Sequence, residues 1–335
     1  MTGFAAHLHP RPEGLYCPGG DFFVDPVRPV HRALITHGHA DHARAGHTHV
    51  LASRQTLDIM AIRYGADFAR HQQAASGPLR IGGVTVSFHP AGHVLGSSQI
   101  RIESAGGVFV VTGDYARTPS PTCAPWEPVP CDVLVTEATF ALPVFRHPDP
   151  GTEIDKLLAS LRAFPERAHL VGAYALGKAQ RVIMLLRQAG WDGPVYVHGA
   201  LQRLCDYHIA QGVALGDLPA ATITRGGKAQ FAGALVIAPP SAFASTWVQR
   251  FPDPVIAFAS GWMQVRARAR QRGVELPLMI SDHVDWPQLT ATLTELAPAE
   301  TWITHGREEA LVRWCTLNGH TAHALNMVGY ADDPD

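Results

Sequence analysis

The spacing of hydrophobic and polar positions changes about 150 residues along the chain. Up to about residue 145, short apolar runs are bounded by glycine, proline or aspartate, which is typical of strands joined by turns. These runs are 33–35, 84–88, 99–102, 108–112 and 133–136. A segment with helical periodicity interrupts them at about 54–64. The first part of the chain is therefore predicted to be rich in strands.

From about residue 153, helices and strands alternate. Periodic segments at 153–163 and 178–189 predict helices, and apolar runs at 169–172 and 195–198 predict strands beside them. Because strands separated by helices usually pair in parallel, this part of the chain is predicted to contain βαβ units. The proline-containing stretch 145–153 before it is a candidate linker.

The last part of the chain again contains several predicted strands. We predict strands near 254–260, 277–281 and 301–304, a helix over 286–296 and a final helix from about 307.

Length and composition agree with two folded domains. At roughly 150 residues per domain, 335 residues correspond to about two, and 46% hydrophobic residues suffice for a core in each. The 27 basic and 29 acidic residues give a formal net charge of −2, so any phosphate-binding surface must be local. No apolar stretch approaches the length of about 18 residues needed to span a membrane. The five cysteines form no CxxC pair, which predicts reduced thiols and a cytoplasmic protein.

The chain contains 19 histidines, and several lie in one loop after the predicted strand 33–35. The sequence Thr-His-Gly-His-Ala-Asp-His places His37, His39, Asp41 and His42 within six residues. Alternate side chains of an extended segment point the same way, so His37 and His39 can converge, and the following turn can bring the other two beside them. Imidazole and carboxylate groups suit a borderline divalent ion. The loop is therefore a candidate site for two closely spaced metal ions.

Two later strand ends supply further candidate ligands. His93 follows the strand 84–88, and Asp114 ends the strand 108–112. Either residue alone would be an ordinary turn residue. Together with the loop 37–42, and in this order, they resemble the metallo-β-lactamase fold, whose metal ligands line one edge of an αββα sandwich.

This resemblance implies a role for each residue. One metal ion would be bound by His37, His39 and His93, the second by Asp41, His42 and His305, and Asp114 would bridge the two. Asp25, in Phe-Phe-Val-Asp-Pro, matches an early aspartate of the family that orients ligands, and an ordinary Asp-Pro turn is the alternative.

The stretch from Asp114 to His305 is far longer than the corresponding stretch in glyoxalase-like and lactamase-like members of this fold, so the resemblance implies an inserted domain. The inserted stretch resembles the β-CASP domain of nucleic-acid-processing nucleases, and three motifs of that group are present in order. They contain Glu137 in Leu-Val-Thr-Glu-Ala-Thr-Phe, His283 in Ile-Ser-Asp-His-Val-Asp-Trp and His305 in Ile-Thr-His-Gly-Arg-Glu. Asp282 is a departure, because many members carry a small residue before the histidine. The carboxylate of Asp282 could alter the protonation of the groups around His283.

We accordingly expect an α/β protein with a metallo-β-lactamase αββα sandwich over 1–150 and 276–335. A β-CASP domain with a parallel sheet, over 151–275, would be inserted in it. The implied chemistry is phosphodiester hydrolysis with two divalent metal ions, and His and Asp ligands accept either zinc or manganese. The resemblance makes His283 the general acid, with Glu137 holding its imidazole charged and oriented. It also places Asp41 in the catalytic set.

One segment nearly matches a nucleotide-binding loop. Gly-Ala-Tyr-Ala-Leu-Gly-Lys-Ala at 172–179 lacks the hydroxyl that would hold magnesium, because position 179 is alanine. Backbone NH groups at this helix start, with Lys178 and Arg181 adjacent, could instead bind a nucleic-acid phosphate, and helix packing is the alternative. Arg266, Arg268, Arg270 and Arg272 form the most concentrated basic run, which could line the path of a nucleic-acid strand, although a solvated polar face is the default for such a run.

Four segments narrow the resemblance to the bacterial DNA ligase-associated exonucleases, short β-CASP proteins whose genes neighbour an ATP-dependent ligase and a helicase. The segments are 14–26, 35–44, 174–180 and 281–286. The resemblance implies a metal-dependent DNA exonuclease that acts in repair, with a DNA ligase and a helicase as functional neighbours and with no membrane partner.

Two other functions stay open at this point. An RNA-processing nuclease is favoured by His305, because related RNA-processing members keep this histidine and Artemis-like DNA members replace it. A catalytically silent β-CASP subunit that binds partners would not need the complete ligand set that is present here.

Overall fold

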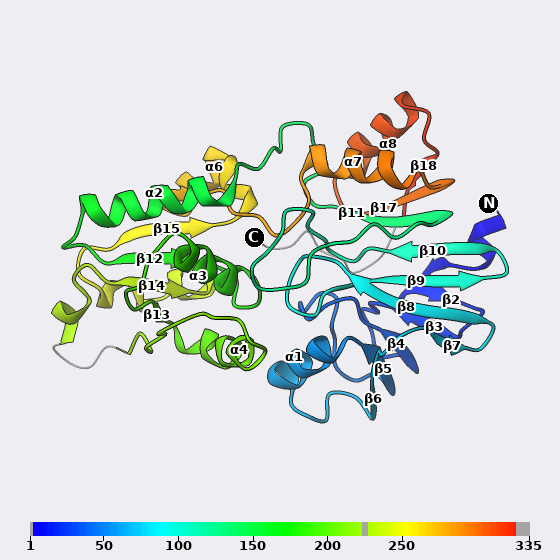
Figure 1. Ribbon diagram of the computed structural model, residues 1–335, viewed down its shortest axis with the longest axis horizontal. Coiled ribbons are helices and arrows are strands. Elements are labelled where there is room, and N and C mark those ends of the chain that lie inside the picture. The colour runs from blue at the N-terminus through cyan, green and yellow to red at the C-terminus, as the bar shows by residue number, and fades with distance from the viewer. Residues whose placement is uncertain (1–2, 223–226, 326–335) are drawn as a thin grey trace. The chain divides into compact units, whose positions relative to one another are not determined.

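The computed structural model describes residues 3–222 and 227–325, which form two compact units (Figure 1). The first unit comprises the chain up to Arg146 together with the chain from His283 onward. The second unit is His147–Asp282. In the sequence, the second unit is therefore inserted between the two segments of the first.

The first unit contains two sheets. The six-stranded sheet follows the chain order: β1 (His9–Arg11), β2 (Gly14–Cys17), β3 (Phe22–Val24), β4 (Arg32–Leu34), β5 (His49–Ala52) and β6 (His71–Ala74). The seven-stranded sheet has the order β18-β17-β11-β10-β9-β8-β7. Its strands are β7 (Leu79–Ile81), β8 (Val84–Pro90), β9 (Ser98–Ser104), β10 (Gly107–Val111), β11 (Val133–Ala138), β17 (Glu300–Gly306) and β18 (Ala322–Ala324). Because β17 pairs in parallel with β11, the chain after the second unit completes the sheet begun before it.

Because side chains alternate between the two faces of each strand, the apolar residues of the first unit form three separate cores. In β11, Val133 and Val135 belong to the core shared with the six-stranded sheet, whereas Leu134 packs in the core on the opposite face. That outer core includes residues of α7 (Trp286–Leu296) and α8 (Glu308–Leu317). On the other side, α1 (Arg54–Tyr64) packs against the outer face of β4 and β5. The layers run helix, sheet, sheet, helix, which confirms the predicted αββα fold class (Figure 1).

The second unit is built on a five-stranded parallel sheet of order β13-β14-β12-β15-β16. Its strands are β12 (His169–Gly172), β13 (Tyr196–Val197), β14 (Leu235–Ala238), β15 (Val255–Ala259) and β16 (Leu276–Leu278). Its helices are α2 (Pro150–Ala163), α3 (Lys178–Gln188), α4 (Gly199–Ala210), α5 (Pro240–Phe243) and α6 (Arg266–Gln271). Residues of α2, α3 and α4 share one core with the sheet, while Phe231 and Phe251 belong to a second core with Leu170 and Val236. The predicted βαβ organisation is confirmed.

The helices α1 and α7 have the predicted bounds, whereas other elements differ from the prediction. The linker predicted at 145–153 is wrong from Pro150 on, because α2 begins there. Asp149 caps this helix by accepting a hydrogen bond from the backbone NH of Gly151 at 2.7 Å, and a proline in the first turn is compatible with a helix. The helix α4 and the strand β14 were not predicted.

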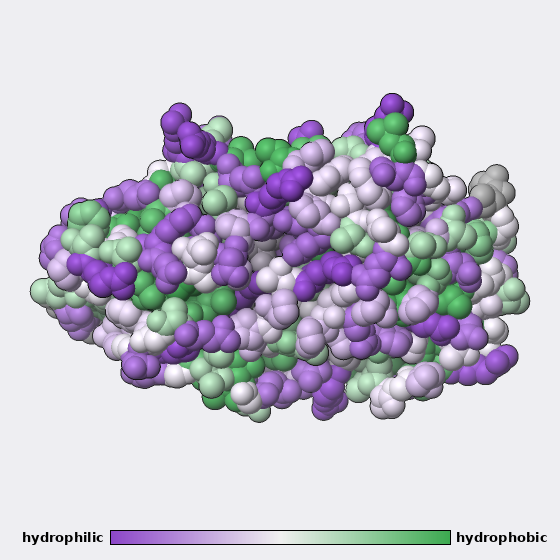
Figure 2. Space-filling view, turned by 45° about the horizontal axis from the view of Figure 1, so that its top comes forward, coloured by the Kyte–Doolittle hydropathy of each residue, from purple (hydrophilic) through white to green (hydrophobic). Residues whose placement is uncertain are grey.

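The five cysteines are free, as predicted. Within residues 3–222 and 227–325, no helix is long and apolar enough to cross a membrane. On the face shown in Figure 2, hydrophilic residues are interspersed with small apolar areas.

Candidate metal centre

The predicted ligands lie at the carboxyl ends of strands in the first unit. The strands β8, β10, β11 and β17 all run in the same direction, because β10, β11 and β17 pair in parallel and β9 is antiparallel to both β8 and β10. His93 and Asp114 therefore follow strands that end at the same edge of the sheet. The loop after β4 brings His37 to the same place, since its ring nitrogen Nε2 lies 3.4 Å from Asp114 Oδ2.

Four side chains form a first group of donor atoms. The Nδ1 atom of His39 lies 3.1 Å from Nε2 of His37 and 3.1 Å from Nε2 of His93. Asp114 Oδ2 lies 3.8 Å from Nε2 of His93. All four donor atoms lie within 4.8 Å of one another. The structure thus brings together the three histidines and the aspartate that were predicted to share one metal ion.

A second group lies on the other side of Asp114. Its carboxylate oxygen Oδ2 is 3.5 Å from Nε2 of His42, and Asp41 Oδ2 is 3.6 Å from the same nitrogen. The rings of His42 and His305 are stacked, with centroids 5.0 Å apart. One oxygen of Asp114 therefore faces both groups, as a bridging carboxylate would.

The spacing of the donor atoms fits divalent metal ions. Zinc–nitrogen bonds of about 2.0–2.1 Å in a tetrahedron place neighbouring donors about 3.3 Å apart. The nitrogen–nitrogen and nitrogen–oxygen separations of the first group, 3.1–3.8 Å, lie around this value. The histidines supply nitrogen and the aspartates oxygen, a donor set that accepts zinc or manganese. The residues present are therefore suited to hold the metal ions that the sequence implies.

Burial tunes the protonation of these ligands. Burial, with the neighbouring imidazoles of His42 and His39, lowers the pKa of His37 well below its ordinary value, and burial lowers the pKa of His305 to about 3. Both imidazoles are thereby kept in the neutral form that binds metal. Burial also disfavours the charged form of His42, but the carboxylates of Asp114, Asp41 and Asp25 outweigh it and raise the pKa of His42. This part of the site keeps a proton that a metal ion would displace.

His305 reaches the site because the pairing of β17 with β11 is interrupted there. Thr304 pairs with Glu137 and Gly306 pairs with Ala138, so His305 is an extra residue in β17. His305 adopts a left-handed backbone conformation with φ of 56°. At Gly306, with φ of 136°, a Cβ atom would lie 2.3 Å from the carbonyl oxygen of Ala138. Glycine is therefore required beside this bulge. Because of the bulge, the side chain of His305 does not follow the regular alternation between the two faces of β17.

Asp25 lies behind the ligands rather than among them. Its Oδ2 accepts a hydrogen bond from Nδ1 of His42 at 2.8 Å, so that His42 presents Nε2 to the site. Thr36 holds Asp25 in turn, since its backbone NH and its hydroxyl donate to the two carboxylate oxygens at 2.8 and 2.6 Å. Sequence analysis did not identify Thr36, although it directly precedes the histidine loop.

Glu137 and His283 form a second buried arrangement. Glu137 Oε2 accepts from Nδ1 of His283 at 2.9 Å and from the hydroxyl of Thr139 at 2.6 Å, while Oε1 accepts from the backbone NH of Tyr115 at 2.8 Å. The ring centroid of His283 is 4.6 Å from that of His93. The predicted pair is thus joined beside the candidate metal ligands. Thr139 was not identified from sequence, although it is two positions from Glu137 in the same motif.

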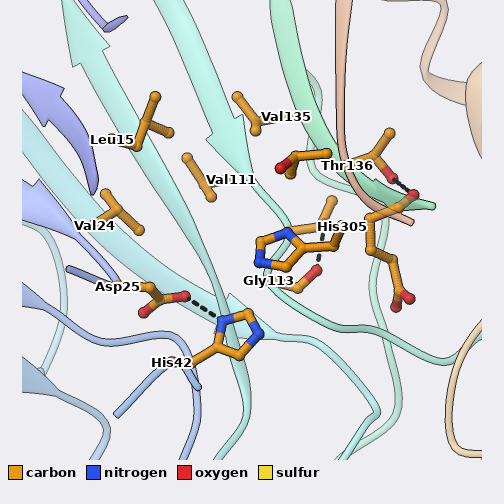
Figure 3. Close-up of a pocket in the computed structure, with 12 residues that line it drawn as sticks. Leu15, Val24, Asp25, His42, Val111, Gly113, Val135, Thr136 and His305 are labelled. Atoms are coloured by element: carbon orange, nitrogen blue, oxygen red, sulfur yellow. Dashed lines mark hydrogen bonds and ion pairs between the residues drawn. The ribbon is translucent and has the colours of Figure 1, made fainter. Parts of the chain in front are cut away.

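A cavity of about 20 Å³ lies behind these groups, between the two sheets. In Figure 3, apolar side chains such as Leu15 and Val111 lie on one side of the cavity, and His42, bonded to Asp25, and His305 lie on the other. Such a volume accommodates about one water molecule. The imidazoles of two candidate metal ligands, His42 and His305, therefore border the apolar core.

In the second unit, the two residues proposed for phosphate binding are buried. Lys178 is 3% exposed and Arg181 is 1% exposed. The ammonium group of Lys178 bonds to the carboxylate of Asp282 and donates to the carbonyl oxygen of Ile280 at 3.3 Å. A phosphate contact by Lys178 and Arg181 stays a prediction, and the described geometry gives Lys178 an internal partner instead. Asp282, the departure from the family pattern, is neutralised by this lysine.

Comparison with known proteins gives three informative similarities. A probable DNA ligase of Opitutus terrae is 25% identical over 317 residues, which are 90% of this chain and 30% of that protein. The RNase aCSPSF2 of Saccharolobus solfataricus is 30% identical over 159 residues, which are 46% of this chain and 30% of that protein. Cleavage and polyadenylation specificity factor subunit 3 of Dictyostelium discoideum is 33% identical over 135 residues, which are 37% of this chain and 17% of that protein.

The αββα sandwich carries the candidate ligands at the ends of its strands. The chain is similar to nucleases of the metallo-β-lactamase/β-CASP group. A crystal structure of a protein of unknown function from Enterococcus faecalis V583 has the same fold, with a TM-score of 0.55 and 13% identity over 90% of this chain and 80% of that one. No family model matches the chain. The chain spans about a third or less of the length of the curated relatives named here.

Proposed function

We propose that this β-CASP chain is a nuclease that hydrolyses phosphodiester bonds with two divalent metal ions, and that it acts on DNA from an end. The observation that carries the proposal is the position of Asp114, whose Oδ2 faces His37 and His93 on one side and His42 on the other. A carboxylate shared in this way is what a two-metal site needs. We also propose that the second unit is the β-CASP domain.

The proposed ligand sets are those expected from the family. His37, His39 and His93 would hold one ion, Asp41, His42 and His305 the other, and Asp114 both. Zinc or manganese in this place would supply activated water and positive charge opposite the phosphoryl oxygens. Asp25 and Thr36 keep Nε2 of His42 directed to the site.

His283 is the proposed proton donor to the leaving oxygen. Its Nδ1 donates to Glu137 Oε2, so the tautomer and the ring orientation are fixed and Nε2 is the atom available for proton transfer. Glu137 is itself held by the backbone NH of Tyr115 and by the hydroxyl of Thr139. The proton donor is therefore placed before substrate binds, which avoids reorganisation during the reaction.

DNA is proposed as the substrate because of a relative that aligns with most of the chain. The Opitutus protein named probable DNA ligase contains a segment similar to 90% of this chain. Such a combination in one protein supports a role beside ligation in DNA repair, with a DNA ligase and a helicase as functional neighbours. RNA is the second candidate substrate, because relatives named as ribonucleases align with 46% and 38% of the chain and because His305 is present.

The test is incubation of the full-length, metal-replete chain with end-labelled single-stranded DNA and RNA of one sequence. The proposal predicts release of mononucleotides from DNA, and loss of this release in the Asp41→Ala variant. Cleavage confined to RNA would establish the second candidate. Absence of cleavage of both strands, in a protein that contains two metal ions per chain, would contradict a nuclease.

A further inference from the structure

The arginine run of the second unit does not form one continuous basic row. The run lies in α6 and the residue after it. Ala269, in the middle of the run, is only 7% exposed and packs against Phe258 and Met263. At 3.6 residues per turn, helical positions two apart point about 160° away from each other, and positions four apart differ by only about 40°. The four arginines therefore divide into the pair Arg266 and Arg270 and the pair Arg268 and Arg272.

The two pairs have different surroundings. The guanidinium of Arg268 lies 3.9 Å from the ring centroid of Trp262, and that of Arg272 lies 4.9 Å from the ring centroid of Phe258. Both thus cover aromatic rings of their own unit, in cation–π contacts. Arg266 and Arg270 are exposed and make no such contact with the described residues.

The positive charge of this helix is not neutralised within the described part of the chain. No carboxylate of residues 3–222 and 227–325 forms an ion pair with any of the four arginines. Glu275, close in sequence, pairs with Arg167 at 3.1 Å instead. Like charges four residues apart destabilise a helix, and α6 contains such a pair in Arg266 and Arg270. In a chain of formal net charge −2, this concentration of charge is local and carries a cost for the free protein.

We infer that Arg266 and Arg270 form a contact surface for the phosphate backbone of a nucleic acid. A polyanion would relieve the repulsion between the two guanidinium groups and would release counterions, which favours binding. Arg268 and Arg272 hold the helix on Trp262 and Phe258 and so keep the exposed pair in place. The inference rests on the proposed function for the identity of the polyanion, and it gives the second unit a role in holding the substrate.

The test is binding of a labelled single-stranded DNA oligonucleotide by the full-length chain in chelator, where no cleavage occurs, over a range of salt concentrations. The R266Q/R270Q variant is compared with R162Q/R203Q, in which two exposed arginines of the same unit are replaced. Arg162 is in α2 and Arg203 is in α4, and the two pairs change the net charge equally. As a separate measurement, the turnover of a small phosphodiester, bis(p-nitrophenyl) phosphate, is determined for the metal-replete form of each protein.

We expect R266Q/R270Q to bind the oligonucleotide about tenfold more weakly near 0.1 M salt and to lower the slope of log affinity against log salt by about 1.4, as for two lost phosphate contacts on a single strand. R162Q/R203Q should change both values much less. Turnover of the small phosphodiester should be the same in all three proteins. The melting temperature of R266Q/R270Q should not fall, because a repulsive pair is removed.

Equal salt slopes for the two variants would overturn the inference. So would equal competition by polyglutamate and by DNA of the same charge concentration, which would indicate an acidic protein partner. Failure of the proposed function is a different result: metal-replete protein would cleave no strand, while the binding comparison in chelator would still separate the two variants.

Discussion

Glu137 accepts three hydrogen bonds at the end of β11, from the backbone NH of Tyr115, the hydroxyl of Thr139 and Nδ1 of His283. It is 1% exposed, so none of these bonds competes with bulk water. A buried carboxylate that is fully bonded in this way holds its partner imidazole in one orientation. At the scale of single residues, the proposed chemistry therefore depends on His283, a histidine that binds no metal ion in the proposed arrangement.

The variant His283→Ala should separate chemistry from metal binding. We expect it to keep the metal content of the wild type and to lose about 10²–10⁴-fold in kcat, the usual contribution of a general acid. Metal analysis and single-turnover cleavage on the same preparation measure the two quantities. The control is His89→Ala, which removes a half-buried histidine whose Nδ1 lies 3.0 Å from Glu127 Oε1, and it should leave both unchanged. Full turnover in metal-replete His283→Ala protein would remove His283 from this role.

The residues with candidate ligand atoms could be predicted because their spacing is local. One loop contains His37, His39, Asp41 and His42. His93 and Asp114 could be found because each lies at or just after the end of a predicted strand. Thr36 and Thr139 could not be found in this way, because a threonine beside a motif is common and its role becomes visible only through the atom that it bonds. The burial of Lys178 was equally hidden, because its partner Asp282 lies more than 100 positions away.

At the scale of elements, the beginning of α3 is tied to the segment before His283. Lys178 bonds to Asp282 and to the carbonyl of Ile280, and Glu153 of α2 accepts a hydrogen bond from the backbone NH of Met279 at 3.0 Å. The segment 279–282 is thus held by two helices of the second unit directly before the chain continues to His283. A lysine that was read from sequence as a phosphate contact serves here to fix a strand end.

Removing one partner of the buried pair Lys178 and Asp282 should lower the free energy of unfolding much more than replacing both partners. Asp282→Ala leaves an ammonium without its carboxylate, and we expect a loss of about 3–5 kcal/mol in the free energy of unfolding. The double variant K178M/D282L should recover most of this loss, because it buries apolar groups instead of a charge. Denaturant unfolding of the three proteins measures the differences.

A surface pair provides the matched control. Arg54 and Asp58 lie 3.4 Å apart on α1, with side-chain exposures of 71% and 33%, and Asp58→Ala should cost less than about 1 kcal/mol. If Asp282→Ala cost no more than this control, the pair would not be the fixed contact described here.

Elements with strong local signals were predicted well, and those defined by distant packing were not. The helices α1 and α7 have clear caps in Ser53 and Asp285, whose side chains accept hydrogen bonds from the backbone NH groups of Thr56 and Gln288. The helix α4 was not predicted, and its cap became visible only in the structure, where the side chain of His198 accepts a hydrogen bond from the NH of Ala200 at 3.1 Å. The bulge at His305 also escaped prediction, because it depends on the register of β17 against β11.

At the scale of the whole molecule, each unit has its own apolar core and only the first contains the proposed metal ligands. Metal ions should therefore stabilise the first unit locally. At a free metal concentration 100 times the dissociation constant, the stabilisation is about 2.7 kcal/mol, which corresponds to roughly 100-fold slower exchange of amides that open with the site.

Hydrogen exchange of the metal-free and metal-replete chain tests this expectation. Segments 36–43, 91–97 and 113–116 should become protected when zinc or manganese is added to chelator-treated protein. The strands β12 and β14 of the second unit should exchange at the same rate in both states. Equal protection in both units, or none in the loop 36–43, would show that metal does not bind where the donor atoms converge.

The proposed nuclease site requires two metal ions, one on each side of Asp114. Anomalous diffraction from crystals of the full-length chain loaded with zinc or manganese measures this directly. We predict two anomalous peaks no more than about 4 Å apart, one beside His37, His39 and His93 and the other beside Asp41, His42 and His305, with Asp114 in contact with both. A single peak, or two peaks that do not share Asp114, would contradict the proposed two-metal centre.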